Sequence, residues 1–366
     1  MPVNHYIDDS LELLRQMVRV PSLTFEEAAV RDLICSALDK WGVPYVVTNG
    51  NIVARSEGYD PSRPTLVLDA HIDTVPANGG YTRDPFDPGD DPARIWGLGS
   101  NDDGGSVAAM IAVFRALRTE PLPVNLLLAL CCEEERSGPD GAAWLYSPAG
   151  LLATDPSYGM PRWGIVGEPT GLRAATSERG LLVLDGEAKG VSGHAARGEG
   201  VNALYIAMDD IAALRAHRFG RVSPVMGEVK LSVTQISAGT AHNVIPDSCR
   251  FVVDMRPTEQ YTNEELLAEV QALCRSTLTP RNLTNRSSAS RPGSALVRTV
   301  EALGIETFSS PTTSDWMRMG FDAVKIGPGE SSRSHRPDEY VECAEIAAAV
   351  DIYTDIILNI YGNTLE

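Results

Sequence analysis

Hydrophobic residues in the first half of the chain form two kinds of pattern, which follow one another in turn along the sequence. Stretches in which apolar positions recur every three or four residues predict helices, at residues 9–18, 25–41 and 106–117. Short apolar runs without alternation predict strands buried on both faces, and the clearest are residues 65–70, 124–130 and 164–166. Helices that alternate with such strands are typical of an α/β fold with a mainly parallel sheet.

The pattern changes near residue 174 and returns to the first one near residue 295. Between them the predicted order is strand, helix, strand, strand, helix, at residues 181–189, 202–217, 230–236, 249–255 and 262–274. This β-α-β-β-α order predicts an α+β domain of residues 176–287, inserted into an α/β domain of residues 1–175 and 288–366. The polar stretch 279–293 is expected to be the returning linker.

Composition narrows the possible partners and the compartment. The formal charge of −18 disfavours binding to nucleic acid or to an anionic membrane surface, because both require a basic face. The first residues lack the features of a signal peptide, and no apolar run reaches the ~18 residues of a membrane helix. The six cysteines show no C-x-x-C spacing, which disfavours a cysteine zinc site and favours buried thiols in a cytoplasmic protein.

Acidic and histidine side chains follow the ends of the predicted strands. In chain order they are His71 and Asp73, Glu133 to Glu135, Glu168, and His335, which lies one loop beyond an apolar strand at 324–326. Asp102 lies in a glycine-rich loop that runs into the helix at 106–117. Because functional groups gather at the carboxyl ends of strands in open α/β sheets, we expect these side chains to converge. Two imidazoles and several carboxylates together predict a site for divalent metal in a metallohydrolase.

Each of these residues also has an ordinary structural interpretation. His71 and Asp73 can be a turn histidine beside a capping aspartate, or a metal ligand whose free ring N–H is held by the carboxylate. Asp102 can cap a helix or bridge two metal ions. It replaces the third glycine of a phosphate-binding loop, which disfavours a nucleotide site. Three adjacent glutamates, 133–135, can form a solvated loop, or one can bind metal while the next acts as general base.

Two residues of the inserted segment are further candidates. His194 is flanked by glycine and alanine, and this accessibility suits a group that stabilises an oxyanion. Arg256 ends an apolar strand, where its planar guanidinium suits the carboxylate of a substrate. The alternative for Arg256 is an ion pair with Asp254 or Glu259.

These motifs resemble those of the M20 family of metallopeptidases and amidohydrolases, and more closely its acetylornithine deacetylase and succinyl-diaminopimelate desuccinylase branch. The matching segments occur in the family's order over nearly the whole chain. They include residues 71–76, 97–102, 134–135, 167–170, 193–194, 243–247, 254–256, 335 and 339–340. The resemblance implies two zinc sites per chain, with cobalt or manganese as substitutes, and a homodimer formed through the inserted domain.

The resemblance also implies how the metal ions are held. His71 and Glu168 would bind one metal ion, and Glu135 and His335 would bind the other. Asp102 would bridge the two ions.

Roles in catalysis and substrate binding follow from the same resemblance. Asp73 would orient His71, and Glu134 would be the general base. His194 would reach the active site of the partner subunit. The substrate's carboxylate would be held by Arg256, Asn243 and Arg179. Two positions depart from the family pattern: many relatives have a lysine at the position of Gly104, and an arginine is common at that of Leu98.

The expected activity is metal-dependent hydrolysis of the amide bond of an N-acyl amino acid. The first candidate substrate is N2-acetyl-L-ornithine, as in arginine biosynthesis, and the alternatives are N-succinyl-ornithine, N-succinyl-diaminopimelate or a dipeptide. A non-catalytic metal-binding scaffold is the alternative from another class. The presence of Glu134 disfavours it, because loss of the general base is the usual mark of such a protein. A nucleotide-binding enzyme is disfavoured because no glycine fingerprint follows a strand in the required form.

Overall fold

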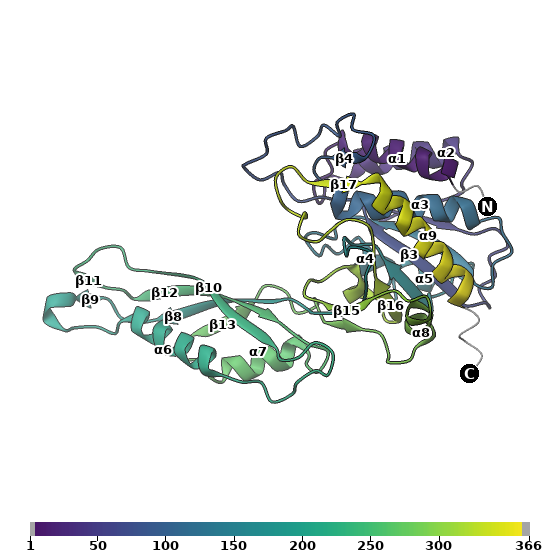
Figure 1. Cartoon of the computed structure of the whole chain (residues 1–366). Helices are drawn as coiled ribbons and strands as arrows, with labels where there is room; N and C mark the ends of the chain where they lie inside the picture. The colour runs from purple at the N-terminus through teal and green to yellow at the C-terminus, as the bar shows by residue number, and fades with distance from the viewer. Residues whose placement is uncertain (1–3, 361–366) are drawn as a thin grey trace. The chain divides into compact units, whose positions relative to one another are not determined.

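A computed structural model describes residues 4–360, and the chain forms two compact units (Figure 1). The first unit contains Met1–Thr176, Ala289–Phe308 and Ser314–Glu366, and the second contains Ser177–Ser288 and Ser309–Thr313. The chain passes from the first unit to the second after residue 176 and returns after residue 288. Each of these positions is one residue from the predicted domain boundary. Residues 309–313 were expected in the first domain. They lie in the second unit, where the N–H of Arg179 donates to the carbonyl of Ser310 (3.1 Å).

A mixed sheet, the centre of which lies in the first unit, has the order β1-β2-β5-β3-β6-β16-β7-β14, with β15 beside β7. Its centre is parallel and consists of β5 (Asn125–Cys131), β3 (Thr65–His71), β6 (Trp163–Val166) and β16 (Asp322–Lys325). Every residue of these four strands is buried, including the charged residues Asp69, Asp322 and Lys325. The flanking strands are β1 (Val46–Thr48), β2 (Asn51–Arg55), β7 (Ala174–Glu178), β14 (Ser288–Ala289) and β15 (Thr307–Ser310).

Helices and loops cover both faces of this sheet. One face packs against α1 (Asn4–Val18), α2 (Ala28–Lys40), α3 (Gly105–Leu117), α8 (Ala295–Ala302) and α9 (Cys343–Asn359), and this side holds the larger apolar core (Figure 1). The other face carries a smaller core that includes Tyr146, Trp316 and residues of α4 (Ala142–Leu145) and α5 (Leu151–Thr154). The predicted α/β fold with a mainly parallel sheet is therefore confirmed.

The second unit is an antiparallel sheet in the order β10-β12-β8-β13, with two helices packed against it. Its elements are β8 (Leu182–Lys189), α6 (Ala203–Ala216), β10 (Lys230–Ala238), β12 (Ser248–Arg256), α7 (Asn263–Gln271) and β13 (Thr277–Pro280). This arrangement confirms the inserted α+β fold. The linker predicted at 279–293 begins inside the sheet, because Thr279 and Pro280 belong to β13 and pair with β8.

Short elements complete the two units. The first contains β4 (Arg94–Trp96) paired with β17 (Tyr340–Glu342), a π-helical turn at Ser100–Gly104 and a 3-10 turn at Asp315–Arg318. The second contains β9 (Gly193–His194) paired with β11 (Val244–Ile245), and a 3-10 turn at Ala195–Arg197. Across residues 4–360, no helix has the length and apolar character needed to cross a membrane.

Candidate metal centre

The parallel strands bring the predicted metal ligands together at their carboxyl ends. His71, Asp102 and Glu168 each offer a ligand atom, and these three atoms lie within 4.8 Å of one another. Asp102, Glu135 and His335 form a second group with the same spacing. Asp102 belongs to both groups, which is the position required of a bridging carboxylate. Imidazole nitrogens and carboxylate oxygens are donors that zinc, cobalt and manganese accept, so the residues fit a pair of divalent ions.

His71 is buried at the end of β3 and is held by its neighbours on both sides of the ring. Its Nδ1 lies 3.0 Å from the carbonyl oxygen of Asp73 and 3.5 Å from Oδ1 of that residue. Its Nε2 lies 3.2 Å from Oδ1 of Asp102. Burial opposes the charged ring, but the hydrogen bonds to Asp102 and Asp73 raise the pKa of His71 well above its usual value. The Nδ1 contacts direct Nε2 toward the ligand group.

Asp73 joins the end of β3 to the loop after β5. Its carboxylate accepts hydrogen bonds from the N–H groups of Glu134 (3.0 Å) and Glu135 (3.1 Å), and from the hydroxyl of Thr24 (2.8 Å). The main-chain carbonyl of Asp73 is nearer to the His71 ring than the carboxylate is. The carboxylate therefore fixes the two glutamates as well as supporting His71, a role that sequence reasoning missed.

The three consecutive glutamates have different surroundings. Oε1 of Glu135 lies 2.9 Å from Nε2 of His335, within the second ligand group. Glu133 has a left-handed backbone (φ 63°), and its carboxylate accepts from the N–H of Asp140 (3.0 Å), so it shapes the loop. Glu134 belongs to neither ligand group, and burial raises its pKa well above the usual range. A cation at the ligand groups would favour the ionised form of Glu134, which can then accept a proton.

A buried glutamate, Glu339, holds the loop that carries Asp102. Its Oε1 accepts hydrogen bonds from the N–H groups of Asn101 (3.0 Å) and Asp102 (2.9 Å). Burial, followed by the charge of Asp102, raises the pKa of Glu339 to about 8. Glu339 lies within a segment that matches the family pattern, but its contact with the Asp102 loop was not predicted. A cation at the ligand groups would favour its ionised form.

Glu168 follows β6 in a site with a buried lysine nearby. Burial, together with the charge of Asp102, raises the pKa of Glu168 well above the usual range, while the charge of Lys325 acts in the opposite direction. Lys325 is 1% exposed and lies on β16, which runs parallel to β6. The sequence contained no signal for this lysine near the site.

Gly104 packs too closely for a side chain. A Cβ atom there would lie 2.5 Å from the carbonyl oxygen of Gly99 and 2.5 Å from Cδ1 of Leu14. Replacing Gly104 with alanine is therefore expected to destabilise the first unit by about 1–3 kcal/mol, measured as a lower Tm. Gly320→Ala is the matched control, because nothing lies within 4 Å of a Cβ there. Equal Tm values for the two variants would contradict this close packing.

The predicted substrate residues lie in the second unit. His194 is exposed, and its Nδ1 accepts a hydrogen bond from the N–H of Ala196 (3.2 Å). Asn243 is also exposed, and its carbonyl accepts from the N–H of Ala195 (3.0 Å), which ties the two loops together. Both side chains are accessible, and their predicted roles, in stabilising the oxyanion and in binding the substrate's carboxylate, stay predictions.

The two predicted arginines already have partners within the second unit. Arg256 forms a two-pronged ion pair with Asp254, at 2.9 and 3.2 Å, which is one of the structural alternatives expected for it. Arg179 is buried and donates to the carbonyls of Met226, Glu228 and Arg256. Their binding of a substrate carboxylate stays a prediction.

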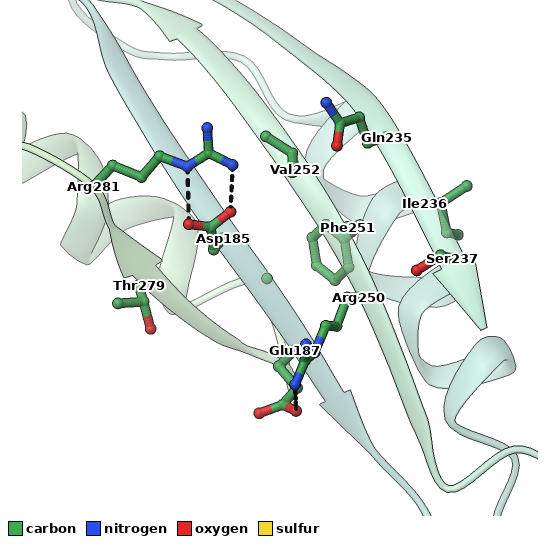
Figure 2. Close-up of a pocket in the computed structure, with 11 residues that line it drawn as sticks. Asp185, Glu187, Gln235, Ile236, Ser237, Arg250, Phe251, Val252, Thr279 and Arg281 are labelled. Atoms are coloured by element: carbon green, nitrogen blue, oxygen red, sulfur yellow. Dashed lines mark hydrogen bonds and ion pairs between the residues drawn. The ribbon is translucent and has the colours of Figure 1, made fainter. Parts of the chain in front are cut away.

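A hollow of about 550 Å³ also lies against the sheet of the second unit (Figure 2). Charged side chains at its two sides are paired, Arg281 with Asp185 and Arg250 with Glu187. Phe251 lies on β12 between Arg250 and Val252, and Val252 lies opposite Asp185. None of the residues proposed for catalysis or metal binding lines this hollow.

The chain is similar to known proteins over most of its length. The model of peptidase family M20/M25/M40 matches residues 67–359. The chain is 30% identical to an acetylornithine deacetylase of Myxococcus xanthus, over 94% of this chain and 93% of that one. It is 27% identical to a succinyl-diaminopimelate desuccinylase of Delftia acidovorans, over 98% and 97%.

Solved structures show the same fold. One is aminopeptidase PepT of Bacillus cereus, with a TM-score of 0.74, 18% identity, and coverage of 97% of this chain and 98% of that one. Another is the YXEP protein of Bacillus subtilis, described as a dinuclear metal binding peptidase of the M20 family. Its TM-score is 0.73 at 15% identity, with coverage of 98% and 99%.

Proposed function

Because the chain belongs to peptidase family M20/M25/M40 and is a hydrolase of that family, we propose that it uses a dinuclear metal centre to cleave N-acyl amino acids. The observation that carries this proposal is the sharing of Asp102 by two ligand groups, with the free carboxylate of Glu134 beside them. A scaffold that had lost catalysis would not need Glu134. The family match confirms the resemblance expected from the sequence. The substrate is still to be identified.

We assign one metal ion to His71 and Glu168 and the other to Glu135 and His335, with Asp102 between them. Zinc is the first candidate, and cobalt or manganese can replace it because all three accept imidazole and carboxylate ligands. Bound metal lowers the pKa of a coordinated water and polarises the carbonyl of the scissile amide.

The protein's own groups handle the proton and the developing charge. Glu134 accepts the proton of the attacking water and returns it to the nitrogen of the leaving amine, so the C–N bond breaks with a neutral amine. Asp73 holds the main chain of Glu134 in position, through the 3.0 Å hydrogen bond to its N–H. His194 is assigned to the oxyanion that forms when water adds to the carbonyl.

The first candidate substrate is N2-acetyl-L-ornithine, which would place the protein in cytoplasmic arginine biosynthesis. Relatives at 25–30% identity include both acetylornithine deacetylases and succinyl-diaminopimelate desuccinylases, so N-succinyl substrates are the second candidate. The test is amine release by the zinc-loaded protein from acetyl-, succinyl- and formyl-ornithine, acetyl-citrulline and succinyl-diaminopimelate. Acetyl-ornithine should give the highest kcat/KM. A higher value for either of the succinyl compounds would reassign the substrate.

A substitution at Arg256 tests how the substrate is bound. Replacing it with lysine keeps the charge but removes the planar fork, and we expect KM for acetyl-ornithine to rise about 10- to 100-fold with metal content unchanged. Arg250→Lys is the control, because Arg250 lies on the same strand and pairs with Glu187 at 3.7 Å. A lower Tm with unchanged KM would show that the ion pair of Arg256 with Asp254 is its whole role.

The second unit presents apolar surface suited to a homodimer. Tyr205 and Met208 on α6 are 64% and 53% exposed, and Ile236 on β10 is 50% exposed. β10 is also an edge strand of its sheet. Exposed edges and apolar patches of this kind favour association with another chain. We therefore propose a homodimer formed through the second unit.

Mixing two inactive variants tests whether His194 acts across the dimer. In a dimer of Glu134→Gln with His194→Ala, one of the two sites would have its own Glu134 and the partner's His194. Random exchange should then restore about one quarter of the wild-type activity. Absence of any recovery, with subunit exchange shown by mass spectrometry, would place His194 outside the partner's site.

A further inference from the structure

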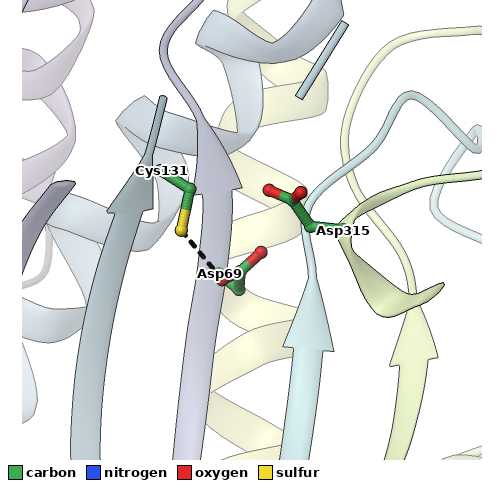
Figure 3. Close-up of side chains that lie close together, drawn as sticks. All are labelled: Asp69, Cys131 and Asp315. Atoms are coloured by element: carbon green, nitrogen blue, oxygen red, sulfur yellow. Dashed lines mark hydrogen bonds between the residues drawn. The ribbon is translucent and has the colours of Figure 1, made fainter. Parts of the chain in front are cut away.

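A second cluster of metal-ligating side chains lies within the first unit and shares no residue with the two ligand groups. It consists of Asp69 on β3, Cys131 at the end of β5 and Asp315 at the start of a 3-10 turn (Figure 3). One ligand atom from each residue lies within 4.8 Å of the others. All three residues are buried, and none of them belongs to the ligand groups around Asp102.

Two oxygens of this cluster have no hydrogen-bond partner. Asp69 is wholly buried, and its Oδ2 accepts from the hydroxyl of Tyr146 (2.6 Å) and from the thiol of Cys131 (3.4 Å), while its Oδ1 is unpartnered. Asp315 is 5% exposed, and its Oδ2 is also unpartnered. Figure 3 shows the two carboxylates directed toward the same space. Buried carboxylate oxygens without partners are costly unless a cation or a shared proton offsets them.

We propose that Asp69, Cys131 and Asp315 bind a third divalent cation, separate from the dinuclear centre, and that this cation is zinc. Two carboxylates and one thiolate form a mixed oxygen and sulfur donor set, which zinc accepts and which magnesium and calcium disfavour. Binding transfers the thiol proton of Cys131 to solvent as the Zn–S bond forms. Tyr146 orients Asp69 by its hydrogen bond to the other carboxylate oxygen.

In the competing explanation, the three side chains bind no metal and are held together only by shared protons. Burial raises the pKa of the Asp315 carboxyl and that of the Cys131 thiol well above their usual values. Neutral groups would then share hydrogen bonds without metal. The two explanations differ in one measurable property, which is whether sulfur is bonded to zinc.

Zinc K-edge X-ray absorption of the purified full-length chain tests the proposal. The residues assigned to the dinuclear centre supply nitrogen and oxygen alone, so a sulfur neighbour at ~2.3 Å from zinc would report the third site even if that assignment failed. Cys131→Ser should remove the sulfur signal and lower bound zinc from about three to about two ions per chain. Asp315→Asn should lower the zinc content in the same way without removing the thiol.

Cys132→Ser is the matched control, because Sγ of Cys132 lies near Asn49 and Asn51 and not in the cluster. It should keep both the sulfur signal and the third zinc ion. Absence of sulfur around zinc in the wild-type protein would overturn the proposal. A sulfur signal that survives in Cys131→Ser would overturn it as well.

Discussion

Replacing Glu134 with glutamine is expected to lower kcat by about 10²- to 10⁴-fold, the usual contribution of a general base. Glutamine keeps the size of the side chain but cannot accept the proton of water. Glu134 is in neither ligand group, so the metal content should stay at the wild-type level. The main-chain hydrogen bond from Glu134 to Asp73 is independent of the side chain, so the loop should keep its position. Steady-state kinetics on metal-quantified protein measures the effect.

Glu133→Gln is the matched control for this variant. The neighbouring carboxylate accepts from the N–H of Asp140, and the amide oxygen of glutamine can accept the same bond. We therefore expect kcat within a few-fold of wild type. Wild-type turnover by metal-loaded Glu134→Gln would remove this residue from the proton-transfer role.

The second large effect is expected from Asp102, which both ligand groups share. Replacing it with asparagine removes the negative charge and leaves one amide oxygen where two carboxylate oxygens face His71 (3.2 Å) and His335 (3.6 Å). Groups that only support metal ligands affect affinity by about 10- to 100-fold, so loss of the shared ligand should exceed 100-fold. Calorimetric titration of the metal-free protein with zinc measures this loss, and activity should fall with it.

Glu339→Gln provides a graded comparison. Glu339 touches the main-chain N–H groups of Asn101 and Asp102 and is not in a ligand group. A supporting role predicts a loss of metal affinity of about 10- to 100-fold, smaller than that of Asp102→Asn. If Asp102→Asn kept two zinc ions at wild-type affinity, the shared position of Asp102 would have no role in metal binding.

The fold could be predicted where hydrophobic pattern decides the structure. The strands before His71, Glu133 and Glu168 are mainly apolar runs, and the structure buries each of them on both faces. The short strands were missed for a physical reason. β13 has four residues with a single buried leucine, and β4 and β17 have three residues each, so their pairing depends on distant partners.

Convergence of the ligand groups could be predicted for a similar reason. Parallel strands end at one edge of the sheet, so residues after three such strands meet there whatever the loops contain. Contacts between loops could not be predicted, because they join residues far apart in the sequence and leave no local sequence pattern. Glu339 reaches the main chain of Asp102 across more than two hundred residues, and Asp315 reaches Asp69 from a turn outside the sheet. The lack of C-x-x-C spacing likewise gave no indication that Cys131 lies close to two buried carboxylates.

The most direct test is hydrolysis of N-acyl amino acids by the chelator-treated protein before and after zinc is restored. The proposed function predicts no amine release from N2-acetyl-L-ornithine or its succinyl analogues without metal, and release of free amine from at least one of them once zinc is bound. Equal hydrolysis with and without metal would contradict the role of the Asp102 centre. Failure of the fully zinc-loaded protein to cleave any N-acyl amino acid would contradict the proposed reaction.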